Sequence, residues 1–503
     1  MVDASYTEVS CTRALNGSLF EQGIQDYAFS IGGANTFIPS KSYFRITLQL
    51  NRLATGDAPI ISDQIAFADN CGANLYSTAS FKMGGVEVSK LSSFAQQASV
   101  IKMRSGSTYQ YLQSIGRDCN ILEPSLSKRI QAVSTDAVGS KNNEAKHIMF
   151  KAKSVPEVPA DKDITISTPG ANNILTLSGG ANTNTYLSTG DEVVISGTSY
   201  IILGTNANTT FSTTTVIQTI GARTDYFFNK RDLQRNSQGH NKIYALYQPP
   251  IGLFDISDNL GSGDYRISLN PNSYYKKAII QSYYNGLTPD VDYNVVVEDV
   301  KFYCYMEKMQ IPDGVKSLSM CEMNIQNKNY ADNLQFSIPS STQKISVFLQ
   351  HPEANYNTKY PPSLFNAVDD ADLKIKSIQL TYAGQSKTST LYESSFLSKG
   401  TVGLTSYTNQ LQQRFIESYE SFSGGVLGST ESYSDWLERG PIFHFNFERD
   451  EQSRDTELQV NIQNLSADPT LSNTKVFIVS WYRSQVSYDS RVGVIQTVKV
   501  NSL

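Results

Sequence analysis

Residues 249–254 read PPIGLF, and a related run, GPIFHF, occupies residues 440–445. In each case a proline-led apolar run is followed by an alternating segment and then by an aromatic-rich one. The following segments read YRISL (265–269) and VKFYCYM (300–306) in the first copy, and LQVNI (458–462) and VFIVSWY (476–482) in the second. A pattern repeated in the same order indicates that one structural unit occurs twice in the chain.

Segments further upstream are repeated at a nearly constant distance. The triplet Ile-Pro-Ser at 38–40 recurs at 338–340, an offset of 300, and RIT at 45–47 matches KIS at 344–346 at an offset of 299. Apolar and polar residues alternate from Phe44 to Leu50, which predicts a half-buried strand. Residues 80–90 resemble residues 377–387 at an offset of 297, and both read as a strand, a glycine turn and a second strand.

A helical pattern follows each of these predicted hairpins. Apolar residues at helical spacing predict one buried face in each, made of Leu91, Phe94, Ala95, Ala98 and Ile101 in the first copy and of Leu411, Phe415, Tyr419 and Phe422 in the second. Such a face is either a partner-binding surface or part of a core. We interpret both as core.

The first copy carries additional residues. Pro250 and Pro441 are 191 residues apart, against an offset of 300 upstream, so about 109 residues are added between the first helical pattern and Pro250. Residues 160–222 are rich in Thr, Asn and Gly and contain a predicted hairpin, in which residues 191–196 and 200–203 flank Gly197-Thr198-Ser199. We predict that residues 160–222 form a small inserted β module that projects outward, since long surface insertions cost little closure entropy.

Composition favours a folded, β-rich chain. Its 503 residues are 40% hydrophobic and 18% charged and include 29 Tyr and 23 Phe, which suits many strands joined by polar turns. The net charge of −5 gives no basic footprint for nucleic-acid binding. The sequence shows neither a signal peptide nor an apolar run of membrane-spanning length, so we expect no secretion. The scattered cysteines, which are expected to be reduced structural thiols, are Cys11, Cys71, Cys119, Cys304 and Cys321.

No constellation of catalytic or metal-binding residues emerges. The histidines have no metal-ligand spacing, and they are His147, His240, His351 and His444. His444 alternates with Phe443 and Phe445, so we expect it to face the other side of a strand as a structural or surface residue. Asp369, Asp370 and Asp372 are interpreted as a solvated loop rather than a Ca²⁺ site, and Lys230, Arg231 and Arg235 as a solvated or interface segment. The sequence therefore predicts no catalytic, cofactor-binding or metal site, and a structural or binding protein rather than an enzyme.

The repeated segments at 250–254 and 441–445, 265–269 and 458–462, and 300–306 and 476–482 resemble the double jelly-roll major capsid proteins of adenoviruses, tailless phages, virophages and Polinton-like viruses. The resemblance implies an all-β chain with two tandem eight-stranded jelly rolls, the first over residues 1–312 with the 160–222 module inserted, the second over 313–503. It further implies trimers of pseudo-hexagonal outline that tile an icosahedral virion, with penton and minor capsid proteins as partners. The 160–222 module is then a candidate receptor-binding element.

Two other interpretations remain open from the sequence. A fibre or adhesin could use the 160–222 module to grip glycan. A polysaccharide-acting β enzyme would need paired Asp or Glu residues that converge in a groove.

Overall fold

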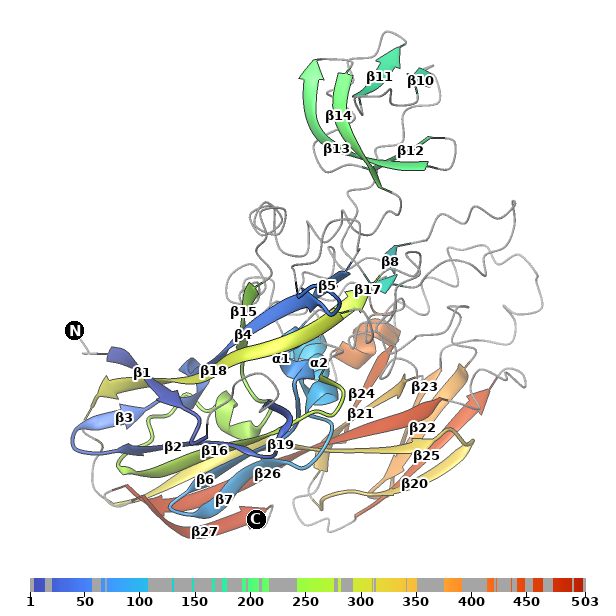
Figure 1. Cartoon of the computed structure of the whole chain (residues 1–503). Coiled ribbons are helices and arrows are strands. Elements are labelled where there is room, and N and C mark those ends of the chain that lie inside the picture. Colours follow the sequence, from blue (N-terminus) through green and yellow to red (C-terminus); the bar gives the residue numbers. More distant parts are fainter. Residues whose placement is uncertain are drawn as a thin grey trace.

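A computed structural model describes residues 4–13, 20–56, 65–67, 70–106, 129–130, 147–148, 165–167, 174–178, 192–195, 198–207, 210–216, 242–275, 279–281, 293–309, 311, 314–340, 342–350, 375–390, 414–419, 422, 436, 441–447, 456–464, 474–490 and 493–500. Most of these residues lie in antiparallel sheets (Figure 1).

The N-terminal sheet pair consists of two facing sheets. The first has the order β1-β18-β4-β15, with bounds Ala4–Ser10, Tyr293–Lys308, Tyr43–Arg52 and Lys242–Tyr247, and β3 (Asn35–Phe37) also pairs with β18. The second has the order β2-β16-β6-β7, with bounds Gln25–Ile31, Gly263–Pro271, Tyr76–Met83 and Val86–Leu91.

The C-terminal sheet pair has the same construction. One sheet has the order β19-β26-β21-β24, with bounds Val315–Asn329, Lys475–Asp489, Thr342–Gln350 and Ile442–Asn446, and β27 (Val494–Val500) also pairs with β26. The other has the order β20-β25-β22-β23, with bounds Asn333–Ser337, Glu457–Asn464, Ile375–Tyr382 and Gln385–Thr390.

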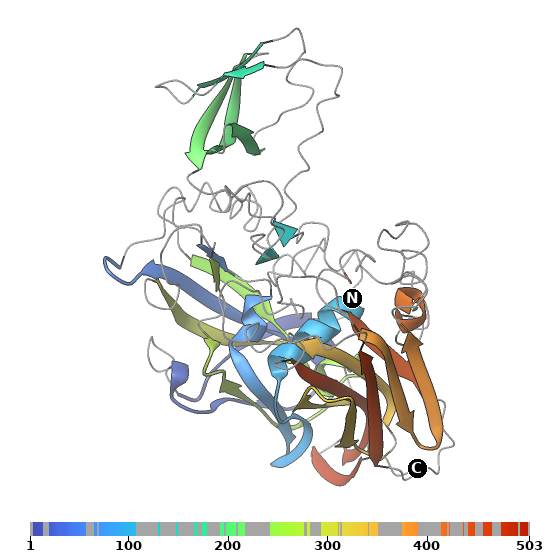
Figure 2. The same cartoon turned by 90° about the vertical axis from the view of Figure 1, so that its right-hand side faces the viewer.

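The two sheet pairs share one topology. When the eight principal strands of each pair are numbered along the chain, both pairs have the strand orders 1-8-3-6 and 2-7-4-5. In these orders the last strand pairs with the first, so the chain's long-range pairings close each sandwich, as in a jelly roll. Figures 1 and 2 show the two pairs side by side.

Strand register gives the offset between the copies directly. Ile46 pairs with Ala245 on β15, and Ile345 pairs with Phe445 on β24. The offset is therefore 299 on the third strand and 200 on the sixth, so the first copy carries 99 additional residues between them. This places the insertion before the sixth strand, as predicted, and revises its size from 109 residues to 99.

The prediction that the two proline-led runs occupy equivalent positions was wrong. Pro249 and Pro250 follow β15 and lead into the 3-10 turn η9 (Gly252–Asp255), whereas Pro441 precedes β24. A proline has no N–H for a ladder hydrogen bond, so it suits either end of a strand equally. The two similar runs therefore lie at opposite ends of equivalent strands, β15 in the first sheet pair and β24 in the second.

The central part of one sheet of the C-terminal pair, in β26, β21 and β24, is buried on both faces. On β26, Val476 and Ile478 belong to the core of the C-terminal pair, while Phe477 and Val479 belong to a cluster shared with the N-terminal pair. Phe477 stacks on Phe348 at 4.9 Å between ring centroids. A strand covered on both faces shows no alternation, which explains the continuous apolar run at 476–479.

Helical segments lie in the predicted places, with different boundaries. Helix α2 covers Ala95–Gly106, so Leu91 belongs to β7 instead of the helix, and Ala95, Ala98 and Ile101 are buried as expected. In the second copy residues 414–419 are helical, with Phe415 and Tyr419 buried. The short helix α1 (Cys71–Asn74) packs beside α2. In the part of the chain that the structure describes, no helix has the length and apolar character needed to span a membrane.

The predicted inserted module contains a five-stranded sheet of its own. Its order is β10-β11-β14-β13-β12, with bounds Thr165–Ser167, Ile174–Ser178, Thr210–Val216, Thr198–Ala207 and Glu192–Ile195. The predicted hairpin is present, since Ile195 pairs with Thr198. Figures 1 and 2 show this sheet apart from both sheet pairs. Two short pairs, β5 (Ile65–Phe67) with β17 (Ile279–Gln281) and β8 (Arg129–Ile130) with β9 (His147–Ile148), complete the described strands.

Glycines line the contact between the two sheet pairs. A Cβ on Gly252 would lie 2.8 Å from the carbonyl oxygen of Cys321, and one on Gly261 would lie 3.0 Å from that of Ser490. Gly263 has a φ of +158° and meets Gly493, so two glycine backbones touch there. The close approach of the two halves therefore requires the absence of side chains at these positions.

We expect Gly252→Ala to destabilise the chain by about 1–3 kcal/mol, because the new methyl group overlaps a backbone oxygen that has no room to move. Thermal unfolding followed by circular dichroism measures this. Gly32→Ala is the matched control, since nothing lies within 4 Å of its Cβ position. Equal melting temperatures for the two variants would contradict the close contact.

Candidate functional site

The outer side of the sheet β1-β18-β4-β15 carries a dense group of aromatic and charged side chains. Along β4 and β18 the alternate residues Phe44, Ile46, Phe302 and Cys304 point into the core and are buried. The residues between them point outward and define what we term the aromatic sheet face: Tyr6, Glu8, Tyr43, Arg45, Tyr244, Lys301, Tyr303 and Tyr305.

Tyrosine rings touch one another across three strands of this face. Tyr43 of β4 stacks on Tyr303 of β18, with centroids 5.5 Å apart and planes at 16°. The ring centroid of Tyr6 on β1 lies 5.5 Å from that of Tyr43 and 5.1 Å from that of Tyr305. Each such cross-strand aromatic pair stabilises the sheet and holds the rings in defined orientations.

Cations lie over these rings. The guanidinium of Arg45 is 5.0 Å from the ring centre of Tyr303 and 5.8 Å from that of Tyr244. The ammonium of Lys41 is 4.6 Å from the ring centre of Tyr305. These distances fit cation–π attraction, so ring and cation positions are coupled.

Carboxylates neutralise the lysines of this face. Glu8 pairs with Lys301 and accepts a hydrogen bond of 3.0 Å from the hydroxyl of Tyr303. The hydrogen bond from Lys301 lowers the pKa of Glu8, and the one from Lys41 lowers the pKa of Glu307. The face therefore offers rings and hydroxyl groups rather than a large net charge.

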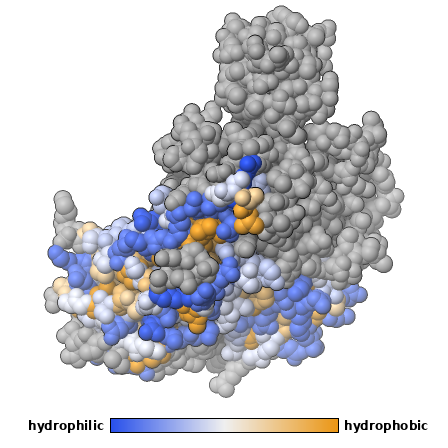
Figure 3. Space-filling model, in the orientation of Figure 1, coloured by the Kyte–Doolittle hydropathy of each residue, from blue (hydrophilic) through white to orange (hydrophobic). Residues whose placement is uncertain are grey.

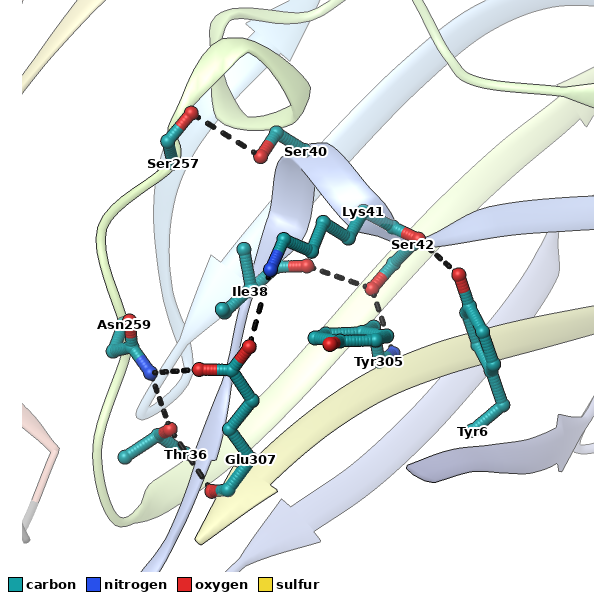
Figure 4. Close-up of polar contacts among 10 residues, drawn as sticks. All are labelled: Tyr6, Thr36, Ile38, Ser40, Lys41, Ser42, Ser257, Asn259, Tyr305 and Glu307. Atoms are coloured by element: carbon teal, nitrogen blue, oxygen red, sulfur yellow. Dashed lines mark hydrogen bonds and ion pairs between the residues drawn. The ribbon is translucent and has the colours of Figure 1, made fainter. Parts of the chain in front are cut away.

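A polar network fixes one corner of the face (Figure 4). Lys41 binds Glu307 at 3.1 Å, and Asn259 donates to Thr36 at 2.7 Å and to Glu307 at 3.5 Å. Ser42 accepts a hydrogen bond of 2.9 Å from the backbone N–H of Tyr305. The corner joins the end of β18 to η2 (Pro39–Lys41) and to the segment after η9.

Two tyrosines of the face are well exposed. The exposed fraction is 66% for Tyr244 and 49% for Tyr6. Figure 3 shows hydrophobic and hydrophilic residues mixed over the part of the surface where Figure 1 places β1 and β3. Such a mixture of rings, hydroxyls and paired charges is typical of a protein–protein contact.

His444 occupies the position that its alternation predicted. Phe443 and Phe445 lie in the core of the C-terminal pair, and His444 faces the N-terminal pair at 4% exposure. Its Nε2 lies 2.8 Å from Ser105 Oγ of α2, and its Nδ1 lies 2.7 Å from Ser346 Oγ. Burial lowers the pKa of His444 to about 3, so the ring is neutral, and its buried position favours a structural over a surface role.

Glu322 was not recognised from the sequence. It lies on β19 between the two sheet pairs at 3% exposure, accepts a hydrogen bond of 2.5 Å from Ser89 Oγ and another of 3.3 Å from the backbone N–H of Gly252. Burial raises the pKa of Glu322 to about 7. The carboxyl group thus connects β19 to β7 and η9.

The other residues weighed in the sequence are only partly placed. His147 lies on β9, whereas His240, His351, Cys119, the aspartates at 369–372 and the basic residues at 230–235 lie outside the described residues. Among the described residues, Cys11, Cys71, Cys304 and Cys321 carry free thiols. Among the described residues, no group of three or more His, Cys, Asp or Glu side chains has the geometry to hold a metal ion.

No family model matches this chain, and no curated protein matches its sequence. Solved structures do match. A chain in the cryo-EM structure of the Sputnik virophage superposes with a TM-score of 0.53 at 12% identity, covering 100% of this chain and 89% of the other. The Faustovirus major capsid protein gives 0.48 at 7% identity, covering 97% and 90%, and the mavirus major capsid protein gives 0.40 at 10% identity, covering 99% and 90%.

The chain has the double jelly-roll fold. The N-terminal sheet pair is the first jelly roll and the C-terminal sheet pair is the second. The sequence prediction of an all-β chain with two tandem eight-stranded jelly rolls is confirmed.

The aromatic sheet face was missed in the sequence although a signal existed. Tyr303 and Tyr305 alternate with the inward-facing Phe302 and Cys304 on β18. Tyr43 and Arg45 lie on either side of the inward-facing Phe44 on β4. That alternation predicts an outward aromatic row on each strand. Only the pairing of β4 with β18 brings the two rows of the first jelly roll together.

We expect the stability of the contact between the jelly rolls to decrease as pH rises. The pKa of Glu322 is about 7 in the folded chain against 4.5 when unfolded, so the folded state binds the extra proton. The resulting stabilisation is complete below pH 4.5, is lost as pH rises through 7, and amounts to about 3 kcal/mol.

Urea unfolding from pH 5 to pH 8 tests this prediction. Glu322→Gln keeps the shape of the side chain and removes the titration, so the pH dependence in this window should shrink. Glu87→Gln is the control, because Glu87 pairs with Lys90 on the surface. A slope that is unchanged in Glu322→Gln would contradict the assignment.

Proposed function

We propose that this chain is a major capsid protein whose trimers, of pseudo-hexagonal outline, tile an icosahedral virus shell. The observation that carries the proposal is the exact repetition of one strand order in two jelly rolls held side by side by a buried contact. Three such chains around a threefold axis give six similar units, which approximates hexagonal symmetry with a closed ring. One of the chains of similar fold comes from the cryo-EM structure of a virophage, which supports the same proposal.

The topology supports a division between a wall and a variable end. Because successive strands are antiparallel, the connections after the third, fifth and seventh strands leave from the same end of a jelly roll. In the first jelly roll these connections are residues 53–75, 92–241 and 272–292, and a hydrogen bond from the N–H of Asn272 to the carbonyl of Leu75 joins two of them. The opposite end has tight links such as residues 84–85.

We place residues 1–312 in the first jelly-roll domain and 313–503 in the second, with the 160–222 module on the outer surface of the shell. Further partners would be penton and minor capsid proteins, with a host receptor bound through the module. The chain acts as a structural component of the virion, without enzymatic activity.

Electron microscopy of the purified protein tests the function. We expect particles of three chains with a hexagonal outline and a mass near three times 55.7 kDa. A population of monomers over the whole accessible concentration range, with specific glycan binding, would favour the adhesin alternative instead.

Deletion of residues 160–222 tests the placement of the module. Its sheet pairs only within itself among the described strands, so trimers should form with unchanged yield and lose only the outer density. Size-exclusion chromatography with light scattering measures this. Loss of soluble trimer would mean that the module belongs to the wall.

A further inference from the structure

Equivalent faces of the two jelly rolls differ sharply in exposure. The register of β15 and β24 makes Tyr244 the counterpart of His444. Tyr244 is 66% exposed, whereas His444 is 4% exposed. The same sheet face is thus open in the first jelly roll and covered in the second.

The first jelly roll supplies the cover within one chain. Helix α2 places Ser105 against His444 and Gln97 against Gln350, whose amide groups are 3.4 Å apart. Phe94, just before α2, packs edge-to-face on Phe477 with centroids 5.4 Å apart. Strand β7 and the turn η9 contact β19 on the same side.

The first strand of each jelly roll shows the same difference. Strand β19 is covered by β7 and η9, and its Met320, Glu322 and Met323 are buried. Its counterpart β1 is exposed along its length except at Val9. An exposed edge strand next to an exposed aromatic face is typical of a surface that binds another protein.

We propose that the aromatic sheet face binds the second jelly roll of a neighbouring copy of this chain. The neighbour would present β23 and its helix at 414–419, which are the counterparts of β7 and α2. This inference rests on the proposed trimer and specifies its contact.

The contact so defined is heterologous, because the face of one jelly roll meets a different surface of the next copy. Repetition of the within-chain contact between chains joins first to second and second to first jelly rolls around a ring, which in the proposed trimer contains three chains. An isologous dimer, with two aromatic sheet faces together, would leave β23 and the helix at 414–419 uncovered.

The chemistry of both surfaces fits a contact between hydrated proteins. Strand β23 reads QSKTST and offers hydroxyl and amide groups, and Ile416 of the helix is 37% exposed. The aromatic sheet face offers tyrosine hydroxyls and rings whose neighbouring charges are already paired. Tyr and Arg are the residues that most often dominate binding energy at such interfaces.

Substitution at the face tests the surface. We expect Tyr244→Glu and Tyr6→Glu each to raise the concentration at which half of the trimers dissociate by at least about tenfold. Both side chains are exposed, so the fold should be retained, which circular dichroism and the melting temperature check. Leu53→Glu is the matched control, since Leu53 is 60% exposed on the connection after β4 and is not one of the residues that define the aromatic sheet face. Mass photometry measures the species.

Cross-linking tests the partner surface. Trimers reassembled from a mixture of ¹⁴N- and ¹⁵N-labelled chains are treated with an amine-reactive cross-linker and analysed by mass spectrometry. Mixed-isotope links from Lys41 or Lys301 to Lys387 of β23 would support the proposal. Mixed-isotope links between two Lys41 residues would overturn it in favour of the isologous contact.

The outcomes separate this inference from the proposed function. Wild-type chains that stay monomeric would contradict the capsid trimer itself. Wild-type trimers that persist unchanged in both Tyr244→Glu and Tyr6→Glu would leave the trimer standing and overturn the assigned surface.

Discussion

The rest of the structure depends on the burial of the sheet β19-β26-β21-β24 on both faces. One face closes the core of the second jelly roll with Val476 and Ile478, and the other packs Phe477 and Val479 against the first jelly roll. At roughly 25 cal/mol per Å² of apolar surface, a sheet face of this kind contributes a large share of the stability of a domain. The two jelly rolls are therefore packed against each other through a shared apolar cluster rather than joined only by a linker.

Two ionisable side chains buried in this contact, His444 and Glu322, form hydrogen bonds across it. His444 lies between Ser105 and Ser346, and Glu322 lies between Ser89 and Gly252. A neutral imidazole and a carboxyl group with a raised pKa avoid the cost of a buried full charge, and their hydrogen bonds fix the register between the halves. The glycines at 252, 261 and 263 permit the close approach that these bonds require.

The same contact makes the two copies of the repeated fold differ in which sheet face is exposed. The second jelly roll has its outer sheet face covered within the chain, while the first exposes the aromatic sheet face. In the proposed trimer, one covered face and one open face on a repeated unit allow identical chains to bind head-to-tail in a ring. The long connections at one end of each jelly roll can differ in length without a change in the sheets, which suits an inserted module of five strands in the first copy.

By itself the sequence determined the class of fold, the duplication and the place of the insertion, because strand alternation and conserved spacing between copies are local properties of the chain. It also predicted that His444 faces away from Phe443 and Phe445. Only the tertiary structure decided which strands pair. Strand pairing places Pro250 after the sixth strand of its jelly roll and Pro441 before the sixth strand of the other, and it brings Tyr43 and Tyr303 together from positions 260 residues apart. The packing of the two jelly rolls covers both faces of β26 at residues 476–479, where the sequence shows no alternation. Those outcomes depend on contacts between distant segments, and no local pattern encodes which distant segment will cover a given face.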